Sequence, residues 1–239
     1  MGPPCAQSPV PVCDLEHAGA HLPSQKRSPV TRLLLLLLVA HPALARLRSY
    51  RPVDYRSRTY WVESSLARCQ PALARLDQNL RQSLALFPSH CRGSLGRLKF
   101  YVLERGKDNG LEYFQANAPA FHPELDPQWS NCVVVYCAQN YLDLSPLWAL
   151  KSVQHELAHA YHLQHYPEDQ PDILAAWRHA LHKGLYPRAY ARSNQLEYFA
   201  ELSVMYFGRC DYPPVDRSAL RDYDPQGYAM IERLWSRTP

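Results

Sequence analysis

The chain has 239 residues, which suffices for one sizeable domain or at most two small ones. Hydrophobic residues make up 46% of it and charged residues 20%, a balance typical of a globular protein rather than a disordered or fibrous one. The net charge is only +4 and the basic residues do not gather in a run, so we expect no nucleic acid partner.

The first 45 residues differ from the rest of the chain. Residues 1–29 show no hydrophobic periodicity, and they are followed by Arg32, an apolar block at 33–40 and an Ala-x-Ala sequence ending at Ala45. These parts in this order are typical of a secretory signal peptide, and a buried leucine helix is the alternative. The block is far shorter than the roughly 20 residues of a membrane span. We therefore expect residues 1–45 to be an N-terminal extension plus signal peptide, and the protein to be secreted or periplasmic without a stable membrane span.

The segment before the apolar block is unusually long for a signal peptide. One hypothesis is that translation starts at Val30, from a GTG codon, and that residues 1–29 are a start-site artefact. Sequencing the N-terminus of the secreted protein tests this, because a mature N-terminus upstream of Val30 would contradict it.

Residues 46–239 are expected to form a single domain. If cleavage follows Ala45, five cysteines remain: Cys69, Cys91, Cys132, Cys137 and Cys210. An exported chain allows disulfides, and the odd number leaves at least one cysteine unpaired within the chain, with the connectivity open. No C-x-x-C pair is present among them, so a structural zinc–thiolate site is not expected.

The region after residue 45 contains helical, strand and loop patterns. A lead-in with Pro and Tyr at 46–60 is followed by apolar residues at helical spacing from 63 to 87. Aromatic and β-branched runs predict strands at 98–104 and 132–137, and prolines mark 115–131 as a loop. Further helical patterns lie at 147–165, 171–183, 194–208 and 224–236. Strands that precede helices in this way predict an α+β fold.

The sequence from His155 to His159 has the pattern H-E-x-x-H and lies within a predicted helix. Residues at i and i+4 share one face of a helix, so the two imidazoles can bind one zinc ion at about 2.0 Å each. Glu156 can then act as the general base toward the attacking water. The alternative is a solvated surface helix that holds no metal.

The third ligand has two candidates, of which the first is His165. It completes the metzincin spacing H-E-x-x-H-x-x-G-x-x-H, except that His162 stands in place of the glycine. That glycine allows the chain to leave the helix and return the third histidine to the metal. A helix that continues through this position carries His165 about 15 Å along its axis from His155, out of reach of the ion.

The second candidate is Glu197, which is followed at i+4 by Glu201 on an otherwise apolar predicted helix. Two carboxylates on such a surface are costly to bury unless a cation or hydrogen-bond donors meet them. Glu197 can bind the zinc ion, and Glu201 can accept the N–H of a ligating histidine, for which His155 is the candidate. A solvated helix face is the alternative for this pair.

H-E-x-x-H followed by E-x-x-x-E is the gluzincin pattern. The segments HELAHAYH, AYARSNQLEYFAELSVMYFG and DYDPQGYAMIERLW resemble the family of the anthrax lethal factor catalytic domain and the small secreted bacterial and fungal proteins of the conidiation-specific type. The resemblance covers about residues 133 to 235 and does not extend to 46–131. It implies a zincin-like metallopeptidase domain of α+β class, with a small sheet, an H-E-x-x-H active-site helix and a helical C-terminal half.

The resemblance also implies roles for individual residues. In that family the first glutamate of the E-F/Y-F-A-E block binds zinc and the second supports a histidine, which correspond here to Glu197 and Glu201. A tyrosine seven residues before the ligand glutamate stabilises the oxyanion, which corresponds to Tyr190. Val204 and Met205 depart from the pattern, because the small secreted relatives usually carry polar or small residues there.

These observations predict a secreted zinc-dependent hydrolase, and among these a metallopeptidase acting on a peptide or protein substrate. The predicted metal ligands for Zn²⁺ are His155, His159 and Glu197, with Glu156 as general base, Tyr190 as oxyanion donor and Glu201 as the support of His155. Two alternatives stay open. One is a non-catalytic secreted binding protein on a gluzincin fold, and the other is a zinc amidase acting on a cell-wall or other non-protein amide.

Two further expectations concern the surroundings of the site. An edge strand ahead of the active-site helix can bind a substrate backbone by strand addition, and the strand at 132–137 is the candidate, with an interior strand as the equal alternative. The remaining histidines of the helical region are expected at the surface or beside the ligands: His162, His165, His179 and His182.

Overall fold

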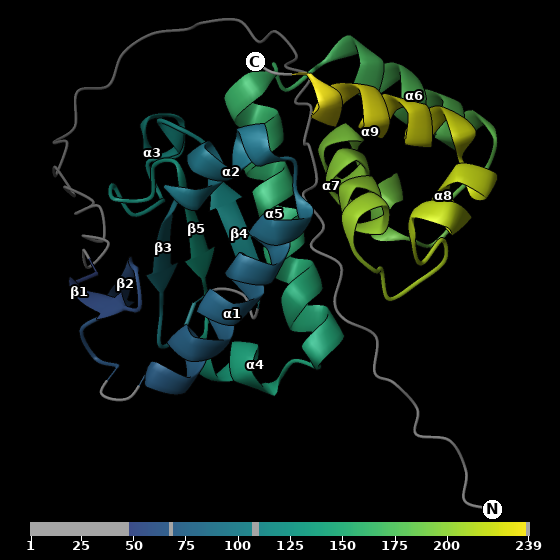
Figure 1. Ribbon diagram of the computed structural model, residues 1–239. Coiled ribbons are helices and arrows are strands. Elements are labelled where there is room, and N and C mark those ends of the chain that lie inside the picture. Colours follow the sequence, from purple (N-terminus) through teal and green to yellow (C-terminus); the bar gives the residue numbers. More distant parts are fainter. Residues whose placement is uncertain (1–47, 67–68, 107–109, 238–239) are drawn as a thin grey trace, which may run out of the picture. The chain divides into compact units, whose positions relative to one another are not determined.

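Strands and helices separate along the chain in the computed structural model, which describes residues 48–66, 69–106 and 110–237 (Figure 1). The strands lie between residues 50 and 135 and form a five-stranded mixed sheet, and the chain after them is helical, so the predicted α+β class is confirmed. The N-terminal extension and signal peptide predicted at 1–45 lie outside the described residues. None of the described helices is both long and apolar enough to cross a membrane.

A β-hairpin at 50–63 corrects two of the predictions. β1 (Tyr50–Tyr55) pairs antiparallel with β2 (Arg58–Glu63), where a lead-in and the start of a helix are expected from the sequence. Helix α1 therefore begins at Gln70 and runs to Leu86. Tyr60 and Val62 of β2 are fully buried at a spacing of two, which is the period of a strand. The leucines further along the chain have helical spacing, and this longer pattern favours a helix over the short strand pattern of β2.

Three more strands complete the sheet. They are β3 (Lys99–Val102), β4 (Leu111–Phe114) and β5 (Cys132–Val135), and the strand order is β1-β2-β3-β5-β4. β2, β3 and β5 run parallel, whereas β1 and β4 pair antiparallel with their neighbours and form the two edges. The strand predicted at 132–137 is thus interior, and β4, which the sequence patterns missed, is the edge strand on that side.

The two faces of the sheet have different covers. Successive side chains of a strand point to opposite faces. One set joins the main core, which helices α1 and α5 (Pro146–His165) share: Phe100, Val102, Val133 and Val135. The other set packs under the segment that follows β4, together with Trp129: Tyr101, Leu103, Val134 and Tyr136. That segment is the loop predicted at 115–131, and it contains one short helix, α3 (Ala118–Phe121).

The long helices of the second half lie within one residue of their predicted ends. Besides α5 they are α6 (Pro171–His182), α7 (Gln195–Phe207) and α9 (Pro225–Ser236). The short elements that the sequence did not predict are α2 (Ser89–Gly96), α4 (Ala138–Asp143), the 3₁₀ helix η1 (Tyr190–Arg192) and α8 (Arg217–Tyr223). These elements are three to eight residues long and leave too few apolar positions to establish a period.

Four rings surround Trp235, and the five rings together form what we call the aromatic cluster: Phe87, Tyr161, Phe199, Phe207 and Trp235. Trp235 is 1% exposed, and its ring stacks on Tyr161 with centroids 3.9 Å apart. The other three rings lie between 4.8 and 6.1 Å from it. The cluster joins α5, α7 and α9 with the end of α1, so it holds the two helices that carry the predicted metal ligands.

No disulfide links the cysteines of the described part of the chain. All five are free thiols: Cys69, Cys91, Cys132, Cys137 and Cys210. All but Cys137 are buried, and burial raises the pKa of Cys91 to about 11 and that of Cys210 to about 12. These thiols therefore stay protonated at neutral pH and act as small apolar side chains in the core.

Candidate metal centre

The histidines of the H-E-x-x-H motif lie on a buried part of α5. Ser145 caps this helix by accepting the backbone N–H of Trp148 at 3.2 Å. His155, Glu156 and His159 are 7%, 7% and 9% exposed. The alternative of a solvated surface helix is therefore wrong for these three side chains.

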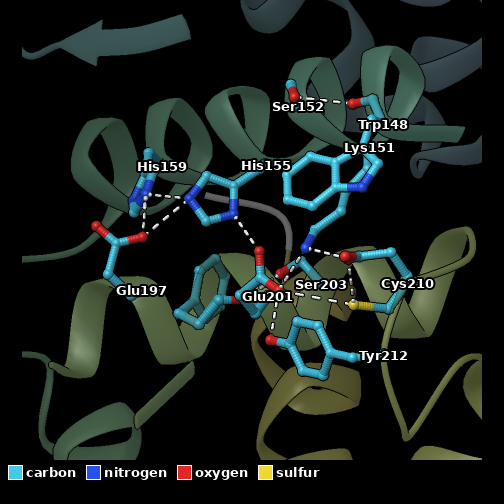
Figure 2. Close-up of polar contacts among 12 residues, drawn as sticks. Trp148, Lys151, Ser152, His155, His159, Glu197, Glu201, Ser203, Cys210 and Tyr212 are labelled. Carbon is cyan, nitrogen blue, oxygen red and sulfur yellow. Dashed lines mark hydrogen bonds and ion pairs between the residues drawn. The ribbon is translucent and has the colours of Figure 1, made fainter. Parts of the chain in front are cut away.

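Helix α7 packs against α5 and brings two carboxylates to it (Figure 2). Asn194 caps α7 by accepting the backbone N–H of Glu197 at 2.9 Å, which places Glu197 in the first turn of the helix. Glu201 follows one turn later and is 1% exposed. Carboxylates in such positions need a cation or hydrogen-bond donors, and the facing side chains of α5 provide them.

Three ligand atoms converge between the two helices. The Nε2 atoms of His155 and His159 are 3.0 Å apart, and they lie 2.9 and 3.3 Å from Oε2 of Glu197. In a tetrahedral zinc site with bonds of about 2.0–2.1 Å, neighbouring ligand atoms are about 3.3 Å apart. Among the residues that the structure describes, this is the group of His, Cys, Asp or Glu side chains that could hold a metal ion.

Hydrogen bonds alone do not satisfy this arrangement. His155 faces a carboxylate at each ring nitrogen, with Oε1 of Glu201 2.8 Å from Nδ1 and Oε2 of Glu197 2.9 Å from Nε2. Nε2 of His159 points at both His155 and Glu197. Each histidine could direct a hydrogen at Glu197, but the 3.0 Å contact between the two Nε2 atoms would then have no hydrogen in it, whereas a cation would accept a lone pair from all three atoms. Two imidazoles and a carboxylate therefore fit a divalent transition metal such as zinc.

The acid–base properties of the two α7 carboxylates are set by α5. Burial acts to raise the pKa of Glu197, but hydrogen bonds from His155 and His159 outweigh it and hold that pKa well below its usual range. Burial acts in the same direction on Glu201, and His155 and Lys151 nevertheless lower its pKa to about 2. Both side chains are therefore carboxylates at neutral pH, which is the form that binds cations and accepts N–H groups.

Glu156 lies next to the converging atoms and is held from the sheet. Its Oε2 accepts the backbone N–H of Tyr113, in edge strand β4, at 2.8 Å. Burial raises the pKa of Glu156 to about 7, against the opposing effect of the two histidines. A carboxyl group with a pKa near neutrality can both accept and release a proton at physiological pH.

Tyr190 lies in η1 at the border of the site. Its ring stacks beside that of His155 with centroids 5.8 Å apart, and the residue is 54% exposed. Desolvation and the charge of Glu197 raise the pKa of Tyr190 well above its usual value, so the phenol keeps its proton. The sequence-based role of Tyr190 as an oxyanion donor stays a prediction.

Glu201 is the hub of a polar cluster that sequence reasoning missed (Figure 2). Its Oε1 faces His155, while its Oε2 lies 3.0 Å from Nζ of Lys151 and accepts the hydroxyl of Tyr212. The thiol of Cys210 is 3.6 Å from the same oxygen. The signal for Lys151 is its position one turn before His155, because residues 151, 155 and 159 share one face of the helix.

Two other histidines of α5 lie away from the converging atoms. His165 is on the last turn of the helix, since α5 continues to it without a break, and it does not join the candidate metal group. His162 is expected at the surface or beside the ligands, but it is fully buried, packs against the ring of Phe199 and donates through Nε2 to the carbonyl of Pro167 at 3.1 Å. The broad apolar environment of α7 extends to this position, which explains the burial.

No family model matches the chain, and neither a curated protein nor a solved structure compared with it gives a match. The likeness to gluzincins thus depends on the motifs themselves and on the geometry of the side chains that carry them.

Proposed function

We propose that the protein is a secreted zinc-dependent hydrolase, and specifically a gluzincin-type metallopeptidase that cleaves peptide bonds. The observation that supports this most is the convergence of His155, His159 and Glu197 from two helices, with Glu156 beside them. Three protein ligands are the number found in catalytic zinc sites, whereas structural sites use four.

The proposed chemistry divides between the ion and the chain. His155, His159 and Glu197 would hold the zinc ion, which when bound would supply a Lewis acid for a carbonyl and for water. Glu156 takes the proton of the attacking water and passes it to the leaving nitrogen. The N–H of Tyr113 holds one carboxylate oxygen of Glu156 and leaves the other for this proton transfer.

Two further residues complete the proposed site. Glu201 accepts Nδ1–H of His155 and so orients Nε2 toward the ion. Tyr190 keeps its proton and donates a hydrogen bond to the oxyanion that forms when water attacks the carbonyl. Glu201 thus orients a ligand and Tyr190 stabilises negative charge, whereas Glu156 transfers the proton.

The edge strand suggests how a peptide would bind. β4 pairs on one side with β5, and Tyr113 on it contacts Glu156, so its open side borders the proposed site. An extended peptide can add to such an edge through main-chain hydrogen bonds. We propose β4 for this role in place of the strand at 132–137, which is interior.

Export is the part of the proposal that depends on the sequence alone. Arg32, the apolar block at 33–40 and the Ala-x-Ala sequence ending at Ala45 support a cleaved signal peptide. A protein processed in this way would act in the periplasm or outside the cell.

Digestion of a peptide library by zinc-loaded protein tests the function. Wild type is expected to cleave peptides, and Glu156→Gln, which keeps the shape of the side chain but is not a base, is expected to lose this activity while it retains zinc. Retained zinc without cleavage of any peptide by wild type would contradict the peptidase assignment. Release of amines from cell-wall amides in the same assay would identify an amidase instead.

A further inference from the structure

A buried lysine lies one turn before the first histidine of the motif. Lys151 is 5% exposed although it carries an ammonium group, and residues 151, 155 and 159 occupy one face of α5. Lysine is almost never buried to this extent unless it is paired. Lys151 lies on the same helix face as the predicted metal ligands, so its burial there must be explained by its partners.

The partners of Lys151 show what keeps it there. Its Nζ lies 3.0 Å from Oε2 of Glu201 and 2.6 Å from Oδ1 of Asp211. The rings of Trp148 and Tyr212 lie 4.9 and 4.8 Å from the same nitrogen, within the range of cation–π contact. Two carboxylates and two ring faces thus surround one cation, and Lys151 connects α5 with the segment that follows α7 (Figure 2).

The two oxygens of Glu201 have different partners. Oε1 faces Nδ1 of His155 at 2.8 Å, whereas Oε2 receives Lys151 and the hydroxyl of Tyr212. A carboxylate that is held at one oxygen cannot rotate freely, so its other oxygen stays directed at His155. Lys151 also provides a positive charge beside Glu201, so that His155 need not supply it.

We propose that Lys151 is a positioning residue for the metal centre: it anchors Glu201 through Oε2, and Glu201 in turn holds His155 with Nδ1–H inward and Nε2 toward the ion. This inference rests on the metal site of the proposed function. It assigns to Lys151 an effect on metal affinity at a distance, because Lys151 itself contacts none of the three ligand residues through a hydrogen bond or ion pair that the structure describes.

Zinc affinity, measured by competition with a chromophoric chelator, is the first test. Lys151→Met is expected to weaken zinc binding about tenfold or more, the range found for partners of metal-ligating histidines. Asp211→Asn is the matched control, because it removes the other carboxylate on Lys151 and leaves Glu201 paired. It is expected to change zinc affinity less than threefold, even though it loosens the same contact between α5 and the segment after α7.

A second variant keeps the test valid if Lys151→Met does not fold. The double variant Lys151→Met/Asp211→Asn removes one charge of each sign from the same ion pair, so the net charge of the cluster stays that of wild type. Compared with Asp211→Asn alone, it is expected to show the same loss of about tenfold or more. Equal affinity of the two would overturn the proposal.

The route through Glu201 is tested by a double-mutant cycle. If Lys151 acts by holding Glu201, Lys151→Met should weaken zinc binding in wild type but not further in Glu201→Gln. Additive losses in the two backgrounds would contradict the positioning role. A spectroscopic check accompanies the cycle: in zinc-loaded protein with labelled histidine, the Nδ1 proton of His155 should exchange slowly with water, and faster after Lys151→Met.

The outcomes separate this inference from the function on which it rests. If wild type binds no zinc, the proposed metallopeptidase fails whatever Lys151 does. If wild type binds zinc and Lys151→Met binds it equally well with an unchanged Nδ1 proton signal, Lys151 is structural and only the positioning role is overturned.

Discussion

Helices α5 and α7 meet in two regions of opposite character. In the first, which includes the candidate metal centre, buried polar groups face one another: Lys151, His155, His159, Glu197 and Glu201. In the second, the aromatic cluster, Tyr161 and Phe199 pack around Trp235 of α9. One pair of helices thus provides both a polar and an apolar interface within a few turns.

The contrast indicates that one set of residues stabilises the fold and another set is suited to binding a cation. Burial of aromatic surface stabilises the fold by about 25 cal/mol per Å². Buried charges contribute little net stability, because desolvation offsets their attraction. The aromatic cluster is therefore expected to hold the helices together, while the polar region retains groups whose benefit appears when a cation is bound.

Removing the centre of the aromatic cluster should have the largest effect on the free energy of unfolding. Trp235→Ala leaves a cavity next to Tyr161 and is expected to destabilise the protein by about 3–5 kcal/mol. Chemical denaturation with and without zinc measures this. Below the unfolding transition, zinc affinity should stay close to that of wild type; a specific loss of affinity in folded protein would show that the two regions are not separable.

A change at Tyr190 is expected to affect catalysis but not stability, because its side chain is largely exposed. Tyr190→Phe removes the hydroxyl that we assign to the oxyanion and should lower kcat by about 10²–10³. Thermal unfolding should be nearly unchanged, because the exposed phenol contributes little to packing. Initial rates on a cleaved peptide measure the effect, and a loss confined to KM would point to substrate binding instead.

Glu201→Gln probes the polar region at its hub. The amide is isosteric, but it is a weaker acceptor for Nδ1–H of His155, and zinc affinity should fall by about 10–100-fold. Chelator competition gives the value. Glu112→Gln, an acidic side chain of β4 outside the candidate metal group, is a control that should leave the affinity unchanged.

The smallest effect concerns His162, which lies between the two regions. Burial lowers its pKa to about 4, below the ordinary value of 6.5, so the folded state favours the neutral ring. The unfolded chain therefore binds more protons between pH 6.5 and 4, and stability is lost as the pH falls through this window. The loss should be about 1 kcal/mol by pH 5.5.

Denaturation of metal-free protein at pH 7.5 and 5.5 measures this loss. His162→Gln lacks the titrating ring and should lose less stability than wild type over the same interval. An equal pH dependence of the two proteins would assign the acid sensitivity to other groups.

Much of the helical half was predictable because its signals are local. Helix ends at Ser145 and Asn194 coincide with side-chain caps, and the spacing of His155 and His159 determines that they share a face. The strands were harder. β4 is a four-residue edge strand whose partner β5 lies beyond the segment at 115–131, and β1, the edge strand of the hairpin, contains no fully buried residue, so no clear local period distinguishes either strand from a loop.

The candidate site also combines contacts that could be predicted from the sequence with contacts that could not. The convergence of Glu197 with the two histidines follows from motif spacing, but the backbone N–H of Tyr113 and the side chain of Tyr212 reach the site from separate segments. Their contacts depend on how the sheet and the helices pack together, which a single sequence does not specify. For Lys151, the sequence predicts the helix face on which it lies, but its burial depends on residues from other segments.

Zinc titration of purified protein, followed by X-ray absorption at the zinc edge, shows whether His155, His159 and Glu197 bind one zinc ion together. We expect one equivalent of tightly bound zinc with two imidazole ligands at about 2.0 Å and oxygen in the remaining positions. Glu197→Ala should weaken this binding strongly. Less than half an equivalent in wild type, unchanged by Glu197→Ala, or a coordination shell without two imidazoles, would contradict it.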